Sequence, residues 1–301
     1  MQPKPLDRSK VRALIAEAEL SLADSPHPER ARQDAEALLL HVLGRSAPDR
    51  NRAWLVAHWN SPTLPKVGTE YRALVGRRLR GEPMQYITGE QEFYGLPFRV
   101  TPDVLIPRPE TEVLVERILE WTAGRGAPLR IVDVGAGAGA IAVALAHHLP
   151  KAQITAIDLS AAALEIAREN ACRNETAIRF LHGDLLAPVA GERFDIVVSN
   201  PPYVAATDRA SLSVEVRDHE PPMALFAGND GLDIYRRLLP AAWRALEPRG
   251  LLALEFGYGQ DRALADMLAG AGFYPVRIFP DLQSIPRVVF GWRPEAACQT
   301  T

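Results

Sequence analysis

The sequence predicts an α/β fold in which a mostly parallel sheet ends in an antiparallel hairpin and follows a small helical domain. Two observations support this prediction. From about residue 111, short apolar segments alternate with helical ones, the order typical of a parallel sheet covered by helices. Before residue 80, apolar residues instead recur at helical spacing. We therefore expect a helical domain over 1–80, a β-hairpin connector over 81–110 and the α/β domain over 111–301.

Length and composition indicate a soluble globular protein, because 47% of the 301 residues are hydrophobic and can form a sizeable core. No stretch reaches the roughly 20 apolar residues of a membrane span, and the N-terminus lacks the apolar centre of a signal peptide. Two cysteines, Cys172 and Cys298, and scattered histidines suggest neither disulfides nor a metal site. We expect a cytoplasmic protein without a metal.

The helical domain should contain three helices. The first is indicated by apolar residues at helical spacing, namely Val11, Leu14, Ile15, Ala18 and Leu22. The second covers 35–43 and ends at Gly44, and the third covers about 67–80. Residues 1–80 hold 14 of the 34 Lys and Arg but 9 of the 37 Asp and Glu, a balance of +5 that leaves −8 for the remainder. This difference indicates separate duties, either contact with an acidic partner or RNA, or simply a solvated helix surface.

The connector and the strands follow from other patterns. In 84–100, aromatic and β-branched residues alternate with glycine-bearing turns, as in a β-hairpin. Buried parallel strands are expected at 129–134, 153–157, 177–181, 194–199 and 251–256. The segments 274–279 and 287–292 flank a turn that contains Pro and Asp, so they should form the closing antiparallel hairpin.

A glycine-rich turn joins the first of these strands to a helix. Its residues are Gly135, Ala136, Gly137, Ala138 and Gly139. Such a turn lets the backbone approach a nucleotide-like ligand at the carboxyl edge of a sheet. The same glycines also satisfy the dinucleotide fingerprint, so by themselves they leave nicotinamide cofactors open.

Neighbouring acids favour S-adenosylmethionine as the cofactor. Asp133 precedes the turn and would repel a pyrophosphate, whereas it suits the cationic methionine end of S-adenosylmethionine. Asp158 would accept hydrogen bonds from ribose hydroxyls or, alternatively, cap the following helix. Asp184 is a candidate for the adenine amino group, or only a turn residue, and Leu185 for the ring face. Together these features indicate a Rossmann-like, class I S-adenosylmethionine-dependent methyltransferase sheet.

The loop Asn200-Pro201-Pro202-Tyr203 follows another buried strand and indicates the reaction. Its prolines cannot donate backbone hydrogen bonds, so the loop is stiff and rich in acceptors. A planar NH2 group is a poor nucleophile and must be positioned. The Asn200 side-chain oxygen and the Pro201 carbonyl would each accept one N–H, and Tyr203 would cover the face of the planar group. The sequence therefore predicts methylation of an amide or exocyclic amine nitrogen.

These motifs resemble the HemK/PrmC family, which methylates the glutamine side-chain nitrogen (N5) in the Gly-Gly-Gln motif of peptide-chain release factors, the proteins of translation termination. The resemblance covers nearly the whole chain: 39–44, 81–89, 93–95, 104–112, 133–139, 200–203 and 230–233. The Ile-Pro-Arg-Pro-Glu-Thr-Glu segment at 106–112 is its most specific part.

The resemblance implies particular roles. The glycine turn, Asp158, Leu185 and Asn200 would line the cofactor, and 200–203 would hold the glutamine. Some members carry an aromatic residue where this chain has Leu185, so stacking on adenine is lost. We expect the helical domain to dock the release factor. The alternatives are an adenine-N6 methyltransferase acting on DNA or RNA, which the acidic catalytic half disfavours, and a non-catalytic adapter, which would be expected to lose the Asn or a proline.

Overall fold

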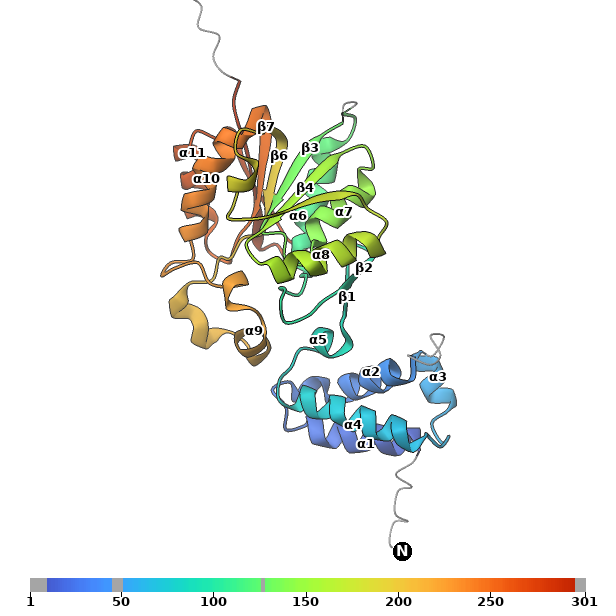
Figure 1. The fold of residues 1–301 in the computed structure, drawn as a ribbon. Helices are drawn as coiled ribbons and strands as arrows, with labels where there is room; N and C mark the ends of the chain where they lie inside the picture. The colour runs from blue at the N-terminus through green and yellow to red at the C-terminus, as the bar shows by residue number, and fades with distance from the viewer. Residues whose placement is uncertain (1–9, 45–50, 126–127, 296–301) are drawn as a thin grey trace, which may run out of the picture. The chain divides into compact units, whose positions relative to one another are not determined.

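The computed structural model describes residues 10–44, 51–125 and 128–295 (Figure 1). The chain divides into two compact units: Met1–Gly89 with Ser213–His219, and Glu90–Leu212 with Glu220–Thr301. The expected boundary at residue 80 thus lies inside the first unit, which also takes up a segment distant in sequence. Cys172 carries an exposed free thiol, and Cys298 lies outside the described residues.

The described part of the first unit is helical. Its helices are α1 (Val11–Leu22), α2 (Ala31–Gly44), α3 (Arg52–Ala57), α4 (Pro65–Leu79), α5 (Met84–Thr88) and α9 (Val214–His219). The helices expected in 1–80 are present as α1, α2 and α4, whose apolar faces meet around Leu14, Leu38 and Tyr71. The Tyr71 hydroxyl donates a hydrogen bond to the Ala35 carbonyl oxygen at 2.9 Å, which keeps this buried polar group satisfied.

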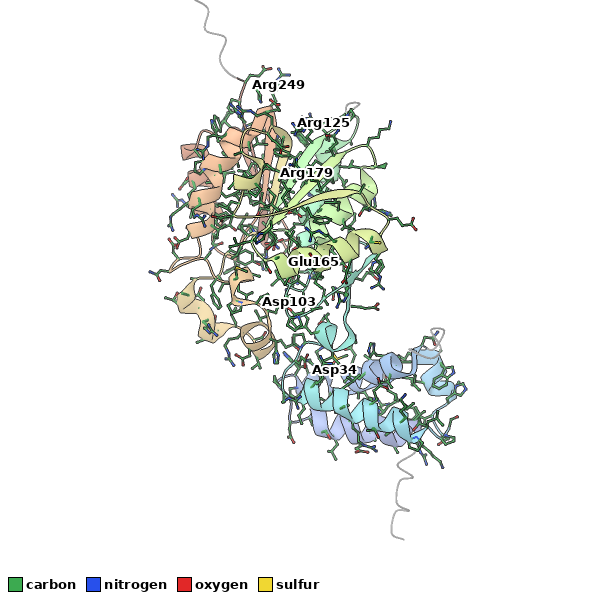
Figure 2. All side chains as sticks on the ribbon, viewed as in Figure 1. Asp34, Asp103, Arg125, Glu165, Arg179 and Arg249 are labelled. Atoms are coloured by element: carbon green, nitrogen blue, oxygen red, sulfur yellow. The ribbon has the colours of Figure 1, made fainter. Side chains whose placement is uncertain are left out.

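An ion pair made by the buried Arg78 joins α9 to this helical core. Arg78 of α4 is only 1% exposed, and its Nε lies 2.6 Å from the Asp34 carboxylate of α2, which Figure 2 labels. The same guanidinium is paired with Glu215 of α9. A buried charge costs several kcal/mol unless it is paired, so the arginine stabilises the unit only when both carboxylates stay in place.

The first residues of the expected connector form a helix, so the hairpin prediction for 84–100 is wrong at its start. Helix α5 follows Pro83 and ends at Thr88, where Gly89, with a φ of +79°, caps it. Tyr86 and Ile87 of this helix are buried, and this gain outweighs their strand propensity. The hairpin itself consists of β1 (Glu90–Phe93) and β2 (Leu96–Arg99), which pair antiparallel across a tight turn.

The second unit is built on a sheet of order β5-β4-β3-β6-β7-β9-β8. Its strands are β3 (Arg130–Val134), β4 (Gln153–Asp158), β5 (Ile178–His182), β6 (Phe194–Ser199), β7 (Leu246–Glu255), β8 (Val276–Pro280) and β9 (Pro286–Trp292). The pairs from β5 to β7 are parallel, whereas β9 pairs antiparallel with both β7 and β8. The predicted sheet and closing hairpin are confirmed. Strand β5 lies at the edge and is half-exposed, contrary to the expectation of burial on both faces.

Helices cover both faces of this sheet (Figure 1). They are α6 (Pro109–Thr122), α7 (Ala140–His148), α8 (Ala161–Arg173), α10 (Asp233–Ala245) and α11 (Asp261–Gly270). Short 3₁₀ helices also occur, at Pro28–Arg30 in the first unit and at Ala187–Val189, Ala206–Ser211 and Pro222–Ala224 in the second. Alternate strand residues belong to different cores: Ile131 packs with α6, α7 and α8, and Val132 with α10 and α11. The carboxyl ends of β3, β4, β5 and β6 therefore meet at one edge. Among the described residues, no helix is long and apolar enough to cross a membrane.

Candidate active site

A cavity opens at the carboxyl ends of β3, β4, β5 and β6. Its lining comes from the four loops after these strands and the starts of α7 and α8, from the segment before α6 and the first turn of that helix, from the segment 221–224 and from α10. These residues include Asp103 (labelled in Figure 2), Val104, Arg108, Thr111, Gly135, Ala136, Gly137, Ala138, Ile141, Asp158, Leu159, Asp184, Leu185, Asn200, Pro201, Pro202, Met223 and Arg237. In an open parallel sheet this edge is where ligands bind, so the cavity is the candidate active site.

Most of the glycine turn lines this cavity. Gly135 and Gly137 have φ values of +75° and +55°, and a Cβ added at either would meet no atom within 4 Å. Because glycine has no side chain, the backbone of the turn faces the cavity directly and a ligand can lie against it. Gly139 serves another purpose, because a Cβ there would lie 3.1 Å from the Cβ of Ala167 in α8. Of the five turn residues predicted to bind the cofactor, Gly139 alone does not line the cavity.

Asp158 connects the glycine turn to the end of β4. One carboxylate oxygen accepts a hydrogen bond from the Gly137 backbone N–H at 2.7 Å, and the other accepts one from Ser160 N at 2.8 Å. Ser160, not Asp158, caps α8 by accepting from Ala163 N at 3.1 Å. Asp158 thus lines the cavity and also holds the turn in shape.

Asp133 lies outside the cavity lining, although the sequence favoured contact with the cationic end of the cofactor. Its side chain is fully buried, and one oxygen accepts a hydrogen bond from Ala142 N at 3.1 Å. Burial raises the pKa of Asp133 to about 7. In this structure the carboxyl holds the first turn of α7 beneath the glycine loop.

After β5, Asp184 and Leu185 both line the cavity. The Asp184 carboxylate is paired with Arg237 of α10, and both side chains are about half-exposed. Leu185 has a φ of +48°, which is rare for a branched residue, and it packs against the core beside α10. The loop is therefore held by α10, a helix that the sequence analysis did not assign.

The loop after β6 brings Asn200 and both prolines to the cavity. Ser199, the last strand residue, donates a hydrogen bond from its hydroxyl to the Val134 carbonyl oxygen at 2.6 Å and so holds β6 beside β3. The Asn200 side-chain nitrogen donates to the Thr111 hydroxyl of α6 at 3.1 Å. Its oxygen is not engaged by this bond and can accept one from a ligand.

Tyr203 is predicted to cover the substrate, but the structure places it beside the cavity and outside its lining. Its hydroxyl lies 3.5 Å from a carboxylate oxygen of Glu255, and its backbone oxygen accepts a hydrogen bond from Gln260 Nε2 at 3.0 Å. Burial, together with the Glu255 charge, raises the pKa of the Tyr203 hydroxyl above its usual value. The phenol therefore stays protonated and can donate.

Known proteins match this chain over most of its length. Residues 13–89 match the PrmC N-terminal domain family, and residues 109–216 match the Methyltransferase small domain family. A release factor glutamine methyltransferase from Bordetella pertussis is 45% identical over 266 residues, which are 88% of this chain and 96% of the relative. One from Koribacter versatilis is 41% identical over 276 residues, 91% of this chain and 95% of the relative. The chain belongs to the release factor glutamine methyltransferase family.

Solved structures show the same fold. A methyltransferase from Pyrococcus furiosus matches with a TM-score of 0.50 and 20% identity, covering 67% of this chain and 91% of that one. The hMettl16 catalytic domain matches with a TM-score of 0.53 and 16% identity, covering 83% and 94%. The fold class predicted from the sequence is confirmed.

In this member of the release factor glutamine methyltransferase family, the sequence analysis missed three residues around the loop after β6. They are Thr111, Glu255 and Gln260. Thr111 lies within 106–112, the segment most specific to the family, and its contact with Asn200 gives that segment a physical role. Glu255 ends an apolar strand, where a buried acid is itself an unusual signal. Nothing in the sequence around Gln260 indicated that it would reach the loop.

Proposed function

We propose that this chain transfers a methyl group from S-adenosylmethionine to the side-chain amide nitrogen (N5) of the glutamine in the Gly-Gly-Gln motif of peptide-chain release factors. The observation that supports it most is that Asn200 and the bare glycine turn line one cavity. A cofactor held by the turn and an amide held by Asn200 would therefore meet. Since release factors act in the cytoplasm, we propose that location too.

The residues present fit S-adenosylmethionine. Bare backbone at Gly135 and Gly137, the Asp158 carboxylate and apolar cover from Leu185 suit a nucleoside with a charged tail. When bound, this cofactor supplies a methyl group on a positively charged sulfur. We propose that the residues holding it are Gly135, Ala136, Gly137, Ala138, Asp158, Asp184 and Leu185.

The chain's own residues would bind and orient the glutamine. We propose that the Asn200 oxygen and the Pro201 carbonyl accept the two N–H bonds of the substrate amide, which directs the nitrogen lone pair and stabilises the positive charge that develops on it. Pro202 keeps the loop stiff, and Tyr203 borders the amide while its hydroxyl faces Glu255. The nitrogen loses its extra proton after transfer.

Incubation with labelled cofactor and a purified release factor tests the activity. We expect one methyl group on the Gly-Gly-Gln glutamine and none on a release factor in which this glutamine is replaced by alanine. Duplex DNA, supplied in a parallel reaction, should stay unlabelled, because no contact with duplex DNA is expected. Labelling of DNA alone would refute the proposal in favour of an adenine-N6 methyltransferase.

We further propose that the first unit docks the release factor. The balance of +5 over residues 1–80, which make up most of this unit, supports contact with an acidic partner surface. Arg12 and Lys66 are exposed on this unit, so Arg12→Glu with Lys66→Glu should raise KM for the whole release factor and leave KM for a short Gly-Gly-Gln peptide unchanged. Equal effects on both substrates would contradict docking at this surface.

A further inference from the structure

Glu255 is a buried acid without a place in the proposed reaction. It is the last residue of β7, only 1% exposed, and it lies outside the cavity lining. The Tyr235 hydroxyl of α10 donates a hydrogen bond to its backbone oxygen at 2.7 Å, so the main chain at this position is fixed. A buried carboxyl disfavours folding unless its charge is matched, and its retention here calls for a reason.

This carboxyl interacts with both ends of the substrate loop, which is the loop at 200–203 after β6. Tyr203 approaches one of its oxygens at 3.5 Å. Burial raises the pKa of Glu255, whereas interactions of its carboxylate with the side chains of Thr111, Arg287 and Asn200 lower it. The Thr111 hydroxyl in turn accepts a hydrogen bond from the Asn200 side-chain nitrogen at 3.1 Å. The buried Glu255 and Thr111 thus form one group of polar side chains with the half-buried Asn200.

We propose that Glu255 is a positioning residue that keeps the NH2 of Asn200 turned into the protein, so that the Asn200 oxygen faces the substrate. Above pH 7, where Glu255 is ionised despite its raised pKa, its carboxylate accepts hydrogen bonds and donates none. If the Asn200 amide turned over, its oxygen would face the Glu255 carboxylate with no proton between them. Because the two ends of an amide are nearly identical in shape, its orientation depends on such partners.

The orientation has a consequence for specificity, which rests on the proposed function. With its oxygen outward, Asn200 accepts an N–H from glutamine but meets a glutamate carboxylate oxygen with no proton to share. With its NH2 outward, the same residue would instead donate to glutamate. Sites that leave a buried polar group unpaired reject the wrong ligand strongly. Glu255 thereby decides, through Asn200, that the site accepts an amide and not an acid.

The test compares wild type with Glu255→Gln, whose side chain both accepts and donates and so permits either orientation of Asn200. Two quantities are measured at pH 8, where the Glu255 carboxyl is ionised: kcat and KM on the release factor, and the ratio of Kd values for the release factor and for its Gln→Glu variant at the Gly-Gly-Gln motif. We expect Glu255→Gln to lose about tenfold in kcat with little change in KM, and to lose about tenfold of its preference for glutamine over glutamate. An unchanged preference would overturn the proposal.

Two further variants separate orientation from loss of stability. Asp34→Asn removes another buried carboxylate, in the first unit, and should destabilise the protein while the glutamine preference remains that of wild type. Thr111→Val removes the other partner of Asn200 and should lower the preference in the same direction, and it decides the question should Glu255→Gln fail to fold. A preference lowered equally by Asp34→Asn would contradict the proposal. Absence of methyl transfer by wild type would instead sink the proposed function.

Discussion

Gln260 holds the main chain of Tyr203 through its side-chain amide. Its nitrogen donates to the Tyr203 backbone oxygen at 3.0 Å, while its oxygen accepts from Gly257 N at 2.9 Å. Two glycines complete the enclosure: a Cβ on Gly257 would lie 2.9 Å from the Tyr203 ring, and one on Gly231 would lie 2.2 Å from the Tyr203 backbone oxygen. The end of the substrate loop is therefore confined on several sides.

Gly231→Ala should displace this loop. The added methyl group cannot avoid the Tyr203 backbone, and overpacking of this kind costs about 1–3 kcal/mol. We expect a lower Tm and a lower kcat. Gly259→Ala is the matched control, because Gly259 has a φ of +78°, close to the +75° of Gly231, with no atom within 4 Å. Equal losses of kcat in both variants would show that backbone strain, not the clash, is responsible.

Asn200→Ala should nearly abolish turnover. The variant keeps the glycine turn and Asp158 but loses the acceptor that orients the amide, and the loss of one such preorganised contact costs about 10²–10³ in kcat. Cofactor binding, followed by calorimetry, should remain measurable. Turnover within a few fold of wild type would refute the role assigned to Asn200.

Stability should fall as pH rises from about 5 to 8. Burial raises the pKa of Glu255 from its usual 4.5 to about 7 against opposing interactions with Thr111, Arg287 and Asn200, whereas the charge of Glu110 raises it further. The folded protein thus binds a proton that the unfolded chain has already lost, so this stabilisation is full below about 4.5 and disappears as pH passes 7. The effect is on the order of 1–3 kcal/mol.

Denaturant unfolding at pH 5 and pH 8 measures this effect. The fall in the free energy of unfolding between the two pH values should be smaller in Glu255→Gln than in wild type. Asp133, whose pKa is also raised to about 7, contributes a similar fall in both proteins and serves as the background. Parallel pH dependences in the two proteins would show that Glu255 does not titrate in this range.

Leu185→Phe should bind S-adenosylmethionine more tightly than wild type. Leu185 lines the cavity and provides apolar cover without a ring, and aromatic stacking contributes about 0.5–1.5 kcal/mol beyond apolar contact. We expect Kd to fall roughly three- to tenfold, by the usual conversion of free energy to affinity. Leu185→Ala should shift Kd the opposite way. Weaker binding by the phenylalanine variant would place the adenine elsewhere.

The parts of the fold that the sequence predicted depend on local signals. Strands β3, β4 and β6 are short apolar runs that end in recognisable turns, and the glycine-rich turn after β3 is visible in the sequence itself. Helix α5 was missed because Tyr86 and Ile87 have strand propensity, and only burial within the helical unit decides their conformation. Propensity yields where tertiary packing is stronger.

The site was predicted in its chemistry but not in its supports. Asn200 and the glycine turn reach one cavity because parallel strands end at one edge, which a βαβ pattern implies. The contact between Asn200 and Thr111 joins residues far apart in the chain, and so does that between Tyr203 and Glu255. Such contacts depend on how α6 and β7 pack in the folded protein, and no short-range sequence pattern predicts them. Tyr203 itself was expected in the lining and lies beside it.

The return of Ser213–His219 to the helical unit means that this unit is not one continuous stretch of sequence. A cut after residue 89 would separate Glu215 from the buried Arg78 and break the ion pair between them. Exchange of the amino-terminal part between relatives, in evolution or in the laboratory, therefore has to carry the distant segment with it. The helical unit is therefore encoded by two separate segments of the sequence, and the two must stay compatible with each other.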